Sequence, residues 1–413
     1  MVPSTRALAQ DLGIARGTVT RVYADLVAEG YLRSSQGAPT RVATAGAAPA
    51  SAPAPGRPRL RERWTLREGR PDPSLFPRDL WLAAHRRVLA QAANDTFGYG
   101  DPRGEPALRT ALSAYLGRSR GVLADPARMV ICAGYSHAIT AVSRALLELG
   151  VPEMAFEDPS YHQFRGLAAQ AGQRVVGVTV DDDGLDVASL SSPAVVVTPA
   201  HQAPLGVTMA PARRTALVRS DALVIEDDYD GEFRFDRQQV GALQAMAPER
   251  VIYAGTTSKT LSPALRLGWL VLPRALVDPV VAMLTASGAV PPVLDQLALA
   301  DLIGSGAYDR HVRRCRTEYR SRRDRLVAAL PKHLTPQGIS AGLHLVVPLS
   351  PSAEAAVPAA SRRHSLGITT LATQWISPGP HPGGLVVGYG AAPGHSFAGA
   401  LSALLNTLTD LPA

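Results

Sequence analysis

Lys259 lies where an apolar run, Val251 to Ala254, meets a loop rich in hydroxyl groups, Gly255-Thr256-Thr257-Ser258-Lys259-Thr260. Arg266 follows seven residues later. A lysine amine at the end of a strand can form a Schiff base with an aldehyde, and a nearby arginine can anchor a phosphate group. Considered alone, Lys259 is more simply explained as a surface lysine in a polar loop. The neighbouring segments decide between these two interpretations.

Two of these segments combine an apolar run with a polar end. The run Ala222 to Ile225 leads into Glu226-Asp227-Asp228-Tyr229, and Met129 to Cys132 leads into Ala133-Gly134-Tyr135-Ser136. A carboxylate at the ligand edge of an α/β sheet can keep a pyridine nitrogen protonated, although capping of a following helix is the alternative. A Gly/Ser turn that opens a helix presents N–H groups to an anion, which suits a phosphate.

The elements that position these residues are predicted from hydropathy. Short Val/Ile/Leu runs alternate with longer helical patterns, which is typical of a mostly parallel sheet covered by helices on both faces. Beyond about Pro273, a long helical stretch through His311, Tyr319 and Leu330 precedes two more strand-like runs, which predicts a small C-terminal α+β lobe. The predicted strands are Met129–Cys132, Glu153–Phe156, Arg174–Val180, Ala194–Val197, Ala222–Ile225, Val251–Ala254, Gly268–Leu272, Gly342–Val347 and Gly384–Gly388.

The composition limits the class of protein. With 413 residues, of which 46% are hydrophobic and 19% charged, the chain is long enough for two or three globular domains. Two cysteines, Cys132 and Cys315, are too few for a disulfide scaffold or a cysteine-built zinc site, so we expect a reducing compartment and no metal. The sequence has no long apolar run and no signal-peptide pattern, so we expect a cytoplasmic protein that is neither exported nor membrane-spanning.

The net charge of +7 is concentrated at the N-terminus. Residues 1–70 carry eleven Arg against five acidic residues, a net charge of +6. A basic segment on a near-neutral body indicates a small module that binds a polyanion, with a solvated basic tail as the alternative. Residues 43–58 contain no bulky apolar side chain, which predicts a linker rich in Pro and Ala.

Two short helices are predicted before this linker. Ser4 can cap a helix that ends at Gly13, and a second helix spans about Ala15 to Glu29. Two helices joined by a Gly-containing turn are typical of a helix-turn-helix, although any amphipathic pair has the same periodicity. The segments Gly30–Arg33 and Arg41–Val42 can form a two-stranded wing. The polar face that we expect to contact DNA consists of Arg6, Arg16, Thr18, Thr20 and Arg21.

Three segments, Val2-Pro-Ser-Thr-Arg-Ala-Leu-Ala, Gly13-Ile-Ala-Arg-Gly-Thr-Val and Leu26-Val-Ala-Glu-Gly-Tyr-Leu, resemble a GntR-type winged helix-turn-helix. That family has a further helix before the Pro-Ser-Thr-Arg segment. We therefore expect either that Met1 lies downstream of the true start or that the module lacks its first helix.

The rest of the chain, from about residue 70 to 400, resembles a pyridoxal-phosphate-dependent aminotransferase of fold type I. The motifs that carry this resemblance occur in order: Tyr99-Gly-Asp-Pro-Arg-Gly-Glu-Pro-Ala-Leu-Arg, Ala133-Gly-Tyr-Ser, Glu157-Asp-Pro-Ser-Tyr161, His201-Gln-Ala-Pro-Leu-Gly, Glu226-Asp-Asp-Tyr, and Ser258-Lys with Arg266-Leu-Gly.

The resemblance implies a role for each matching residue. Lys259 is the Schiff-base lysine that forms the internal aldimine, Asp227 pairs with the pyridine nitrogen, and Tyr229 donates to the phenolic oxygen. Tyr161 stacks on the ring, and Tyr99 reaches across a dimer interface. The residues expected to hold the phosphate are Gly134, Tyr135, Ser136, Thr256, Ser258 and Arg266.

The whole arrangement resembles the MocR/GabR family of transcriptional regulators. The resemblance implies a homodimer that binds double-stranded operator DNA and senses a small-molecule effector through pyridoxal 5′-phosphate. We expect a DNA-binding module over 1–43, a linker over 44–69 and an aminotransferase-like domain over 70–413. Within that domain, we expect the large lobe over about 70–290 and the small lobe over about 310–413.

Two positions depart from the aminotransferase pattern. Ala203 replaces an Asn that meets the phenolic oxygen, and Ala391 lies where an Arg clamps the substrate carboxylate. We therefore expect sensing rather than turnover, with pyridoxal phosphate itself, an amino acid or an amine without a carboxylate as the effector. An active aminotransferase with a vestigial DNA-binding segment is the alternative, and a cofactor-free dimer scaffold is a third.

Overall fold

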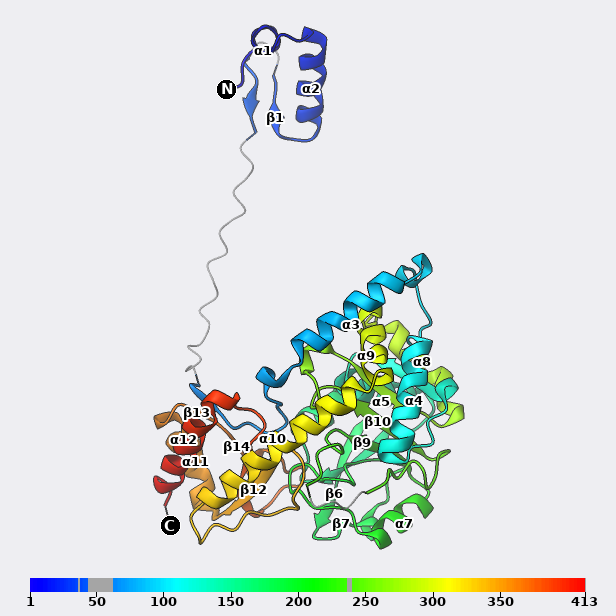
Figure 1. The fold of residues 1–413 in the computed structure, drawn as a ribbon, viewed down its shortest axis with the longest axis vertical. Helices are drawn as coiled ribbons and strands as arrows, with labels where there is room; N and C mark the ends of the chain where they lie inside the picture. Colours follow the sequence, from blue (N-terminus) through cyan, green and yellow to red (C-terminus); the bar gives the residue numbers. More distant parts are fainter. Residues whose placement is uncertain (36–37, 44–61, 236–239, 413) are drawn as a thin grey trace. The chain divides into compact units, whose positions relative to one another are not determined.

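The computed structural model describes residues 1–35, 38–43, 62–235 and 240–412. The chain divides into two compact units, Met1–Leu60 and Arg61–Ala413 (Figure 1). Within the described ranges, no helix combines the length and the apolar composition needed to cross a lipid bilayer.

The N-terminal unit contains two helices and a two-stranded antiparallel ribbon. The Ser4 hydroxyl accepts a hydrogen bond from the backbone N–H of Ala7 at 3.1 Å, which caps the first helix as expected. Gly13 ends that helix in the left-handed region, at φ 64°. The predicted elements are therefore present, whereas DNA binding by this unit stays a prediction. The elements are α1 (Thr5–Leu12), α2 (Arg16–Ala28), β1 (Leu32–Arg33) and β2 (Arg41–Val42).

A mostly parallel sheet forms the centre of the second unit. Its strand order is β4-β11-β10-β9-β8-β5-β6-β7. The pairs from β10 through β9, β8 and β5 to β6 are parallel, whereas β11 is antiparallel to both of its neighbours. The strands are β4 (Met129–Cys132), β5 (Glu153–Asp158), β6 (Arg174–Asp181), β7 (Gly184–Leu185), β8 (Ala194–Val197), β9 (Leu223–Asp228), β10 (Val251–Thr256) and β11 (Gly268–Val271).

Helices cover both faces of this sheet, as the apolar runs predict. In β4, Val130 and Cys132 pack with residues of α5 and α8, whereas Met129 and Ile131 pack on the opposite face with residues of α4 and α9. Successive side chains of a strand point to opposite faces, so a strand between two helical layers is apolar throughout. The helices are α3 (Arg78–Gln91), α4 (Pro106–Arg120), α5 (Tyr135–Glu148), α6 (His162–Gln170), α7 (Pro211–Arg219), α8 (Val277–Ala286) and α9 (Val293–Gly304).

A long helix, α10 (Ala307–Ala329), connects the large lobe to the small lobe (Figure 1). Tyr319 and Leu326 of this helix belong to the core of the small lobe. That lobe contains an antiparallel sheet of order β12-β15-β14 and two helices, which confirms the predicted α+β lobe. Its elements are β12 (His344–Leu349), α11 (Pro351–Arg363), β13 (Leu366–Gly367), β14 (Thr369–Thr370), β15 (Gly383–Gly388) and α12 (Phe397–Thr409).

The segment before residue 70 differs from the expected linker. Residues 44–61 of that linker lie outside the described residues, but Trp64–Thr65 forms β3, which pairs in parallel with β13. Leu66 is 1% exposed in the core of the small lobe. The end of the linker therefore shifts to before Trp64. Sequence patterning missed this strand because it has only two residues and its pairing partner lies about 300 residues away in the chain.

Candidate functional site

A cavity of about 240 Å³ lies at the carboxyl ends of β5, β8, β9 and β10. Ligands of open α/β sheets bind at this edge, because the loops that follow the parallel strands leave a crevice there. The small lobe closes the cavity with His344 and Gln374. The lining residues are Glu68, Gly69, Tyr135, Ser136, Phe156, Glu157, Ser160, Tyr161, Gln163, Phe164, Val196, Thr198, Ala203, Pro204, Asp227, Tyr229, Thr256, Ser258, Lys259, Pro263, Arg266, His344 and Gln374.

Lys259 and Asp227 place an amine and a carboxyl group on the same cavity. The Lys259 Nζ donates a hydrogen bond of 2.6 Å to the carbonyl oxygen of Gly69. Burial lowers the pKa of Lys259, although the charge of Asp227 opposes this shift. Burial also raises the pKa of Asp227 well above its usual value, and the charge of Lys259 opposes that shift in turn. A lysine whose pKa is lowered is more readily the neutral nucleophile that Schiff-base formation requires.

Another part of the cavity is suited to an anion. Helix α5 begins at Tyr135 directly after Gly134, which has φ 79°. The first N–H groups of a helix have no acceptor within the helix, and they carry its positive dipole end. A Cβ added at Gly134 would lie 3.5 Å from Nη1 of Arg266, so this guanidinium lies beside the start of the helix. The hydroxyls of Thr256 and Ser258, which are 2.9 Å apart, line the same cavity.

Aromatic side chains and Tyr229 line the space between these groups. Tyr161 and Phe164 make an edge contact, with ring centroids 5.1 Å apart. The hydroxyl of Tyr229 donates to the carbonyl oxygen of His201 at 3.0 Å. Burial raises the pKa of Tyr229 well above its usual value, so this hydroxyl keeps its proton at neutral pH. Ala203 also lines the cavity and offers no side-chain donor there.

The structure brings together most of the predicted cofactor-binding residues. All of them line the cavity except Gly134, which lies against Arg266, and Tyr99, which is fully exposed. In the N-terminal unit, all the predicted DNA-binding side chains are exposed, and the Thr20 hydroxyl donates to the carbonyl oxygen of Arg16 at 3.0 Å.

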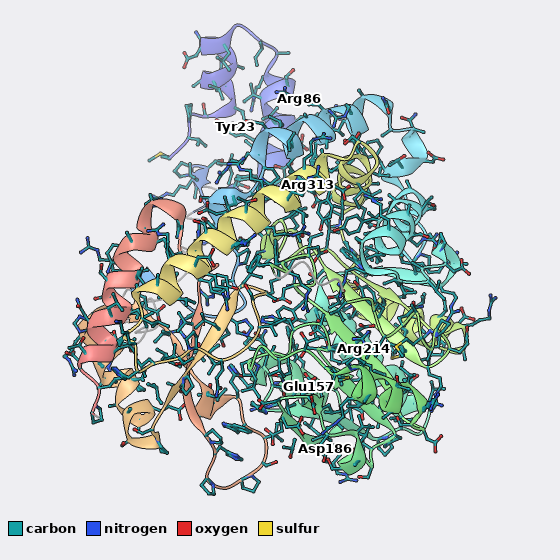
Figure 2. The ribbon with its side chains drawn as sticks, turned by 60° about the horizontal axis from the view of Figure 1, so that its bottom comes forward. Tyr23, Arg86, Glu157, Asp186, Arg214 and Arg313 are labelled. Atoms are coloured by element: carbon teal, nitrogen blue, oxygen red, sulfur yellow. The ribbon has the colours of Figure 1, made fainter. Side chains whose placement is uncertain are left out.

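Several lining residues were not predicted. Glu157 lies inside the large lobe, where burial raises its pKa to about 7 although the Thr198 hydroxyl and N–H donate to it (Figure 2). Gln374 donates from Nε2 to Oε1 of Glu68 at 3.1 Å. Burial lowers the pKa of His344 to about 3, which keeps this imidazole neutral. Glu157 stands within a quoted motif, but Glu68, His344 and Gln374 lie outside every motif, and no local pattern in the sequence could have indicated them.

Ala391 does not line the cavity and is 4% exposed. Among the described residues that line the cavity, the basic side chains are Lys259, Arg266 and the neutral imidazole of His344. Lys259 and Arg266 already face the carboxyl group of Asp227 and the start of α5. These described lining residues therefore offer no further cation for a substrate carboxylate.

Comparison with known proteins agrees with this geometry. Residues 70–376 match the family described as aminotransferase class I and II. The kynurenine aminotransferase of Pyrococcus horikoshii, crystallised in complex with PMP, has a TM-score of 0.74 and 21% identity, covering 84% of this chain and 91% of that one. At this identity the likeness shows the fold alone, and it confirms the predicted fold class of the aminotransferase-like domain.

Regulatory proteins match over almost the whole chain. "Probable rhizopine catabolism regulatory protein MocR" of Rhizobium meliloti is 33% identical, over 94% of this chain and 85% of that protein. The HTH-type pyridoxine biosynthesis transcriptional regulator PdxR of Corynebacterium glutamicum is 30% identical, over 94% of this chain and 87% of that protein. These alignments extend well beyond the aminotransferase-like region.

Proposed function

The chain belongs to the MocR family of HTH-type transcriptional regulators and carries an aminotransferase class I and II domain, and from this premise we propose that it regulates transcription by sensing a ligand at Lys259. Pyridoxal 5′-phosphate, the cofactor predicted from the sequence, is the cofactor of this fold. The observation that carries the proposal is the convergence of Lys259, Asp227, Tyr229 and Arg266 on one cavity.

The residues present fit this cofactor. When bound, it supplies an aldehyde for an amine and a pyridinium ring that withdraws electrons. The buried amine of Lys259 would bind the aldehyde, and the carboxyl group of Asp227 would hold the proton on the ring nitrogen. Tyr229 would donate to the phenolic oxygen, and Tyr161 would contact the ring. The start of α5 would bind the phosphate together with Thr256, Ser258 and Arg266.

The effector is an amine that lacks the carboxylate bound by an Arg in aminotransferases, or it is pyridoxal phosphate itself. This follows from Ala391, because a bidentate Arg clamp is what fixes an amino-acid carboxylate in aminotransferases. Without that clamp, turnover of ordinary amino acids is slow, and binding can serve as a signal. Tyr99 belongs to a homodimer contact in this proposal, and its full exposure on the isolated unit is the supporting observation.

DNA is the partner of the N-terminal unit. Helix α2 presents Arg16, Thr18, Thr20 and Arg21 to solvent, and Arg6 is exposed on α1. The first turn of α2 holds no acidic residue, so its N-terminal end is positive and suited to the phosphates and base edges of a major groove.

The proposal that the protein senses a ligand is tested by measuring its affinity for DNA with and without the cofactor. A DNA duplex is selected from a random-sequence library with the full chain, and binding is then followed by fluorescence anisotropy while pyridoxal phosphate or simple amines are added. The affinity should change for the wild-type chain and should not change for Lys259→Ala. A transaminase assay on the same samples decides the alternative, because rapid turnover of amino acids would make the chain an enzyme.

The DNA-binding half is tested by a charge-matched pair of variants. Arg16→Ala should reduce discrimination between the selected duplex and random DNA by about 5- to 150-fold, which corresponds to about 1–3 kcal/mol per base-reading arginine. Arg313→Ala removes an equal charge from the exposed face of α10 and should leave discrimination unchanged. Equal losses in the two variants would remove α2 as the recognition helix.

A further inference from the structure

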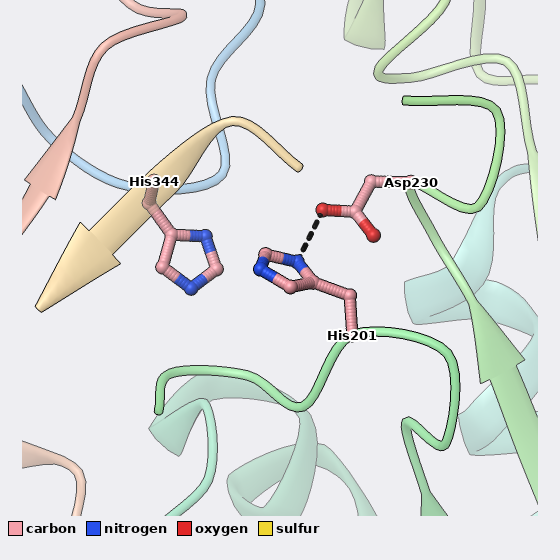
Figure 3. Close-up of side chains that lie close together, drawn as sticks. All are labelled: His201, Asp230 and His344. Atoms are coloured by element: carbon pink, nitrogen blue, oxygen red, sulfur yellow. Dashed lines mark hydrogen bonds and ion pairs between the residues drawn. The ribbon is translucent and has the colours of Figure 1, made fainter. Parts of the chain in front are cut away.

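Three buried side chains from distant parts of the chain meet beside the cofactor cavity. His201 follows β8, Asp230 follows β9, and His344 is the first residue of β12 in the small lobe (Figure 3). They are 2%, 2% and 3% exposed. One potential ligand atom from each residue lies within 4.8 Å of those of the other two.

The outer nitrogen of each imidazole is held by a group that only accepts hydrogen bonds. His201 Nδ1 lies 2.9 Å from Oδ2 of Asp230, and His344 Nε2 lies 3.1 Å from the carbonyl oxygen of Pro204. An ionised carboxylate and a carbonyl both lack a proton to give, so both of these nitrogens carry the hydrogen. In a neutral imidazole the other nitrogen then has a free lone pair. These lone pairs are on Nε2 of His201 and Nδ1 of His344.

Both inner nitrogens are buried, and no hydrogen-bond partner reaches either of them within the described part of the chain. The ring edge of His201 that carries Nε2 is turned toward His344 in Figure 3, and the two ring centroids are 5.0 Å apart. Two buried acceptors without a donor between them are unfavourable, because each loses its hydrogen bond to water. Each of these two nitrogens therefore lacks a donor or a cation.

We propose that Nε2 of His201 and Nδ1 of His344 bind a divalent transition-metal cation of the zinc type. A histidine that binds a metal almost always donates its other ring N–H to a carboxylate or a carbonyl, and both arrangements are present here. Imidazole nitrogen suits zinc, copper and nickel, whereas magnesium and calcium prefer oxygen. Zinc–nitrogen bonds are about 2.0–2.1 Å long, so one ion can reach ligand atoms that lie up to 4.8 Å apart only if the rings move closer together.

The charge of Asp230 favours a cation over a bridging water molecule. Its buried carboxylate accepts from Nδ1 on the far side of His201, which orients the ring and places a negative charge near the proposed cation. His344 lines the cofactor cavity, so the remaining coordination positions can be filled from that side. The Tyr229 hydroxyl lies 3.0 Å from Nδ1 of His201, which connects this metal site to a residue of the cofactor cavity.

The test uses the full chain without an affinity tag, stripped with a chelator and titrated with zinc chloride in a calorimeter. We expect one zinc ion per chain with micromolar or tighter affinity. His344→Gln and His201→Gln should each weaken binding by at least 100-fold, and Asp230→Asn by about 10- to 100-fold, as is usual for a residue that orients a ligand. The matched control is His333→Gln, an exposed histidine whose replacement should change nothing.

Cobalt(II) gives a readout that needs no variant. Cobalt(II) bound through imidazole in a four-coordinate site should produce visible d–d absorption bands. Added zinc should displace the cobalt ion and remove these bands. Absence of these bands in the wild-type chain, or zinc binding no tighter than millimolar, would show that water fills the space and would overturn the proposal. Unchanged affinity in folded His344→Gln would overturn it as well.

Discussion

Asp227 and Asp228 are neighbours at the end of β9, yet they face two very different environments. Asp227 lines the cavity together with Lys259. Asp228 faces the opposite side, where Nε of Arg120 is 2.6 Å and Nη2 is 3.1 Å from its carboxylate, and the Tyr253 hydroxyl donates to it at 2.6 Å. The Arg120 side is thus closed by a bidentate ion pair.

The difference shows how one strand serves two purposes. Because side chains alternate across a sheet, consecutive acidic residues must point to opposite faces. On the Arg120 side the carboxylate of Asp228 is paired with Arg120 and Tyr253 within the protein, which stabilises the fold. On the cavity side, groups such as Lys259 and Asp227 are buried by the surrounding protein, which shifts their pKa values and leaves them available to a ligand.

The largest effect is expected from Lys259→Ala. The chain contains only two lysines, Lys259 and Lys332, and Lys332 is exposed. Borohydride reduction should fix one cofactor on each wild-type chain and none on Lys259→Ala, because no other buried amine faces the cavity among the described residues. Mass spectrometry measures the adduct. Lys332→Ala is the control and should be labelled like wild type, and a persistent adduct on Lys259→Ala would refute the assignment.

Asp228→Ala should cause the largest loss of stability among the acidic residues of β9. Removing this carboxylate leaves the guanidinium of Arg120 buried without its charge partner, which costs about 3–5 kcal/mol. Urea unfolding of the cofactor-free protein measures the change, so that cofactor binding does not contribute. Asp227→Ala breaks no such pair, and it should lose clearly less free energy of unfolding in the same experiment.

Asp227→Ala should instead weaken cofactor binding by about 10- to 150-fold, which corresponds to the loss of a hydrogen bond to a charged group at about 1.5–3 kcal/mol. Its visible spectrum should shift because the ring nitrogen loses its proton partner. Titration of the cofactor-free variant with pyridoxal phosphate gives the affinity. If Asp228→Ala showed this effect and Asp227→Ala did not, the comparison between the two sides would be reversed.

The smallest effect concerns pH. Burial raises the pKa of both Glu157, on the cavity side, and Glu226, on the Arg120 side, to about 7. The folded protein therefore keeps protons that the unfolded chain has released, and each group makes the protein less stable as pH rises from about 4.5 to about 7. Glu157→Gln removes this pH-dependent loss of stability. It should raise the free energy of unfolding by on the order of 1 kcal/mol at about pH 8 and change it little at about pH 5.

Glu226→Gln is the matched comparison for that variant. The two oxygens of Glu226 accept separately from the N–H groups of Leu243 and Gln244, so an amide would turn its NH2 toward one of these donors. Glu157 accepts from Thr198 and Gln202 through Oε2 alone, and a glutamine oxygen can replace it. Glu226→Gln should therefore gain no stability at high pH. Thermal unfolding at both pH values measures the difference.

Local patterns in the sequence were sufficient for the strands and for most of the cavity. Met129–Cys132 and Ala194–Val197 form strands with the predicted bounds, because strands buried on both faces are apolar at every position. Lys259, Asp227 and Tyr229 were identified because they lie at or near the ends of such strands, within motifs that resemble those of aminotransferases. Trp64–Thr65, in contrast, was assigned to the linker, because a two-residue strand among arginines has no periodicity of its own.

The sequence by itself determined the fold class, the family and the order of the chemical groups along the chain. The resemblance singled out Asp227 of the two adjacent carboxyl groups, and the tertiary structure supplied their environments, with Lys259 beside Asp227 and Arg120 beside Asp228. Only the tertiary structure brought Glu68 next to Gln374 and His201 next to His344, pairs separated by more than 100 residues. Contacts at such separations depend on how the lobes pack. Burial also arises only from that packing, and it shifts pKa values and leaves some nitrogens without partners.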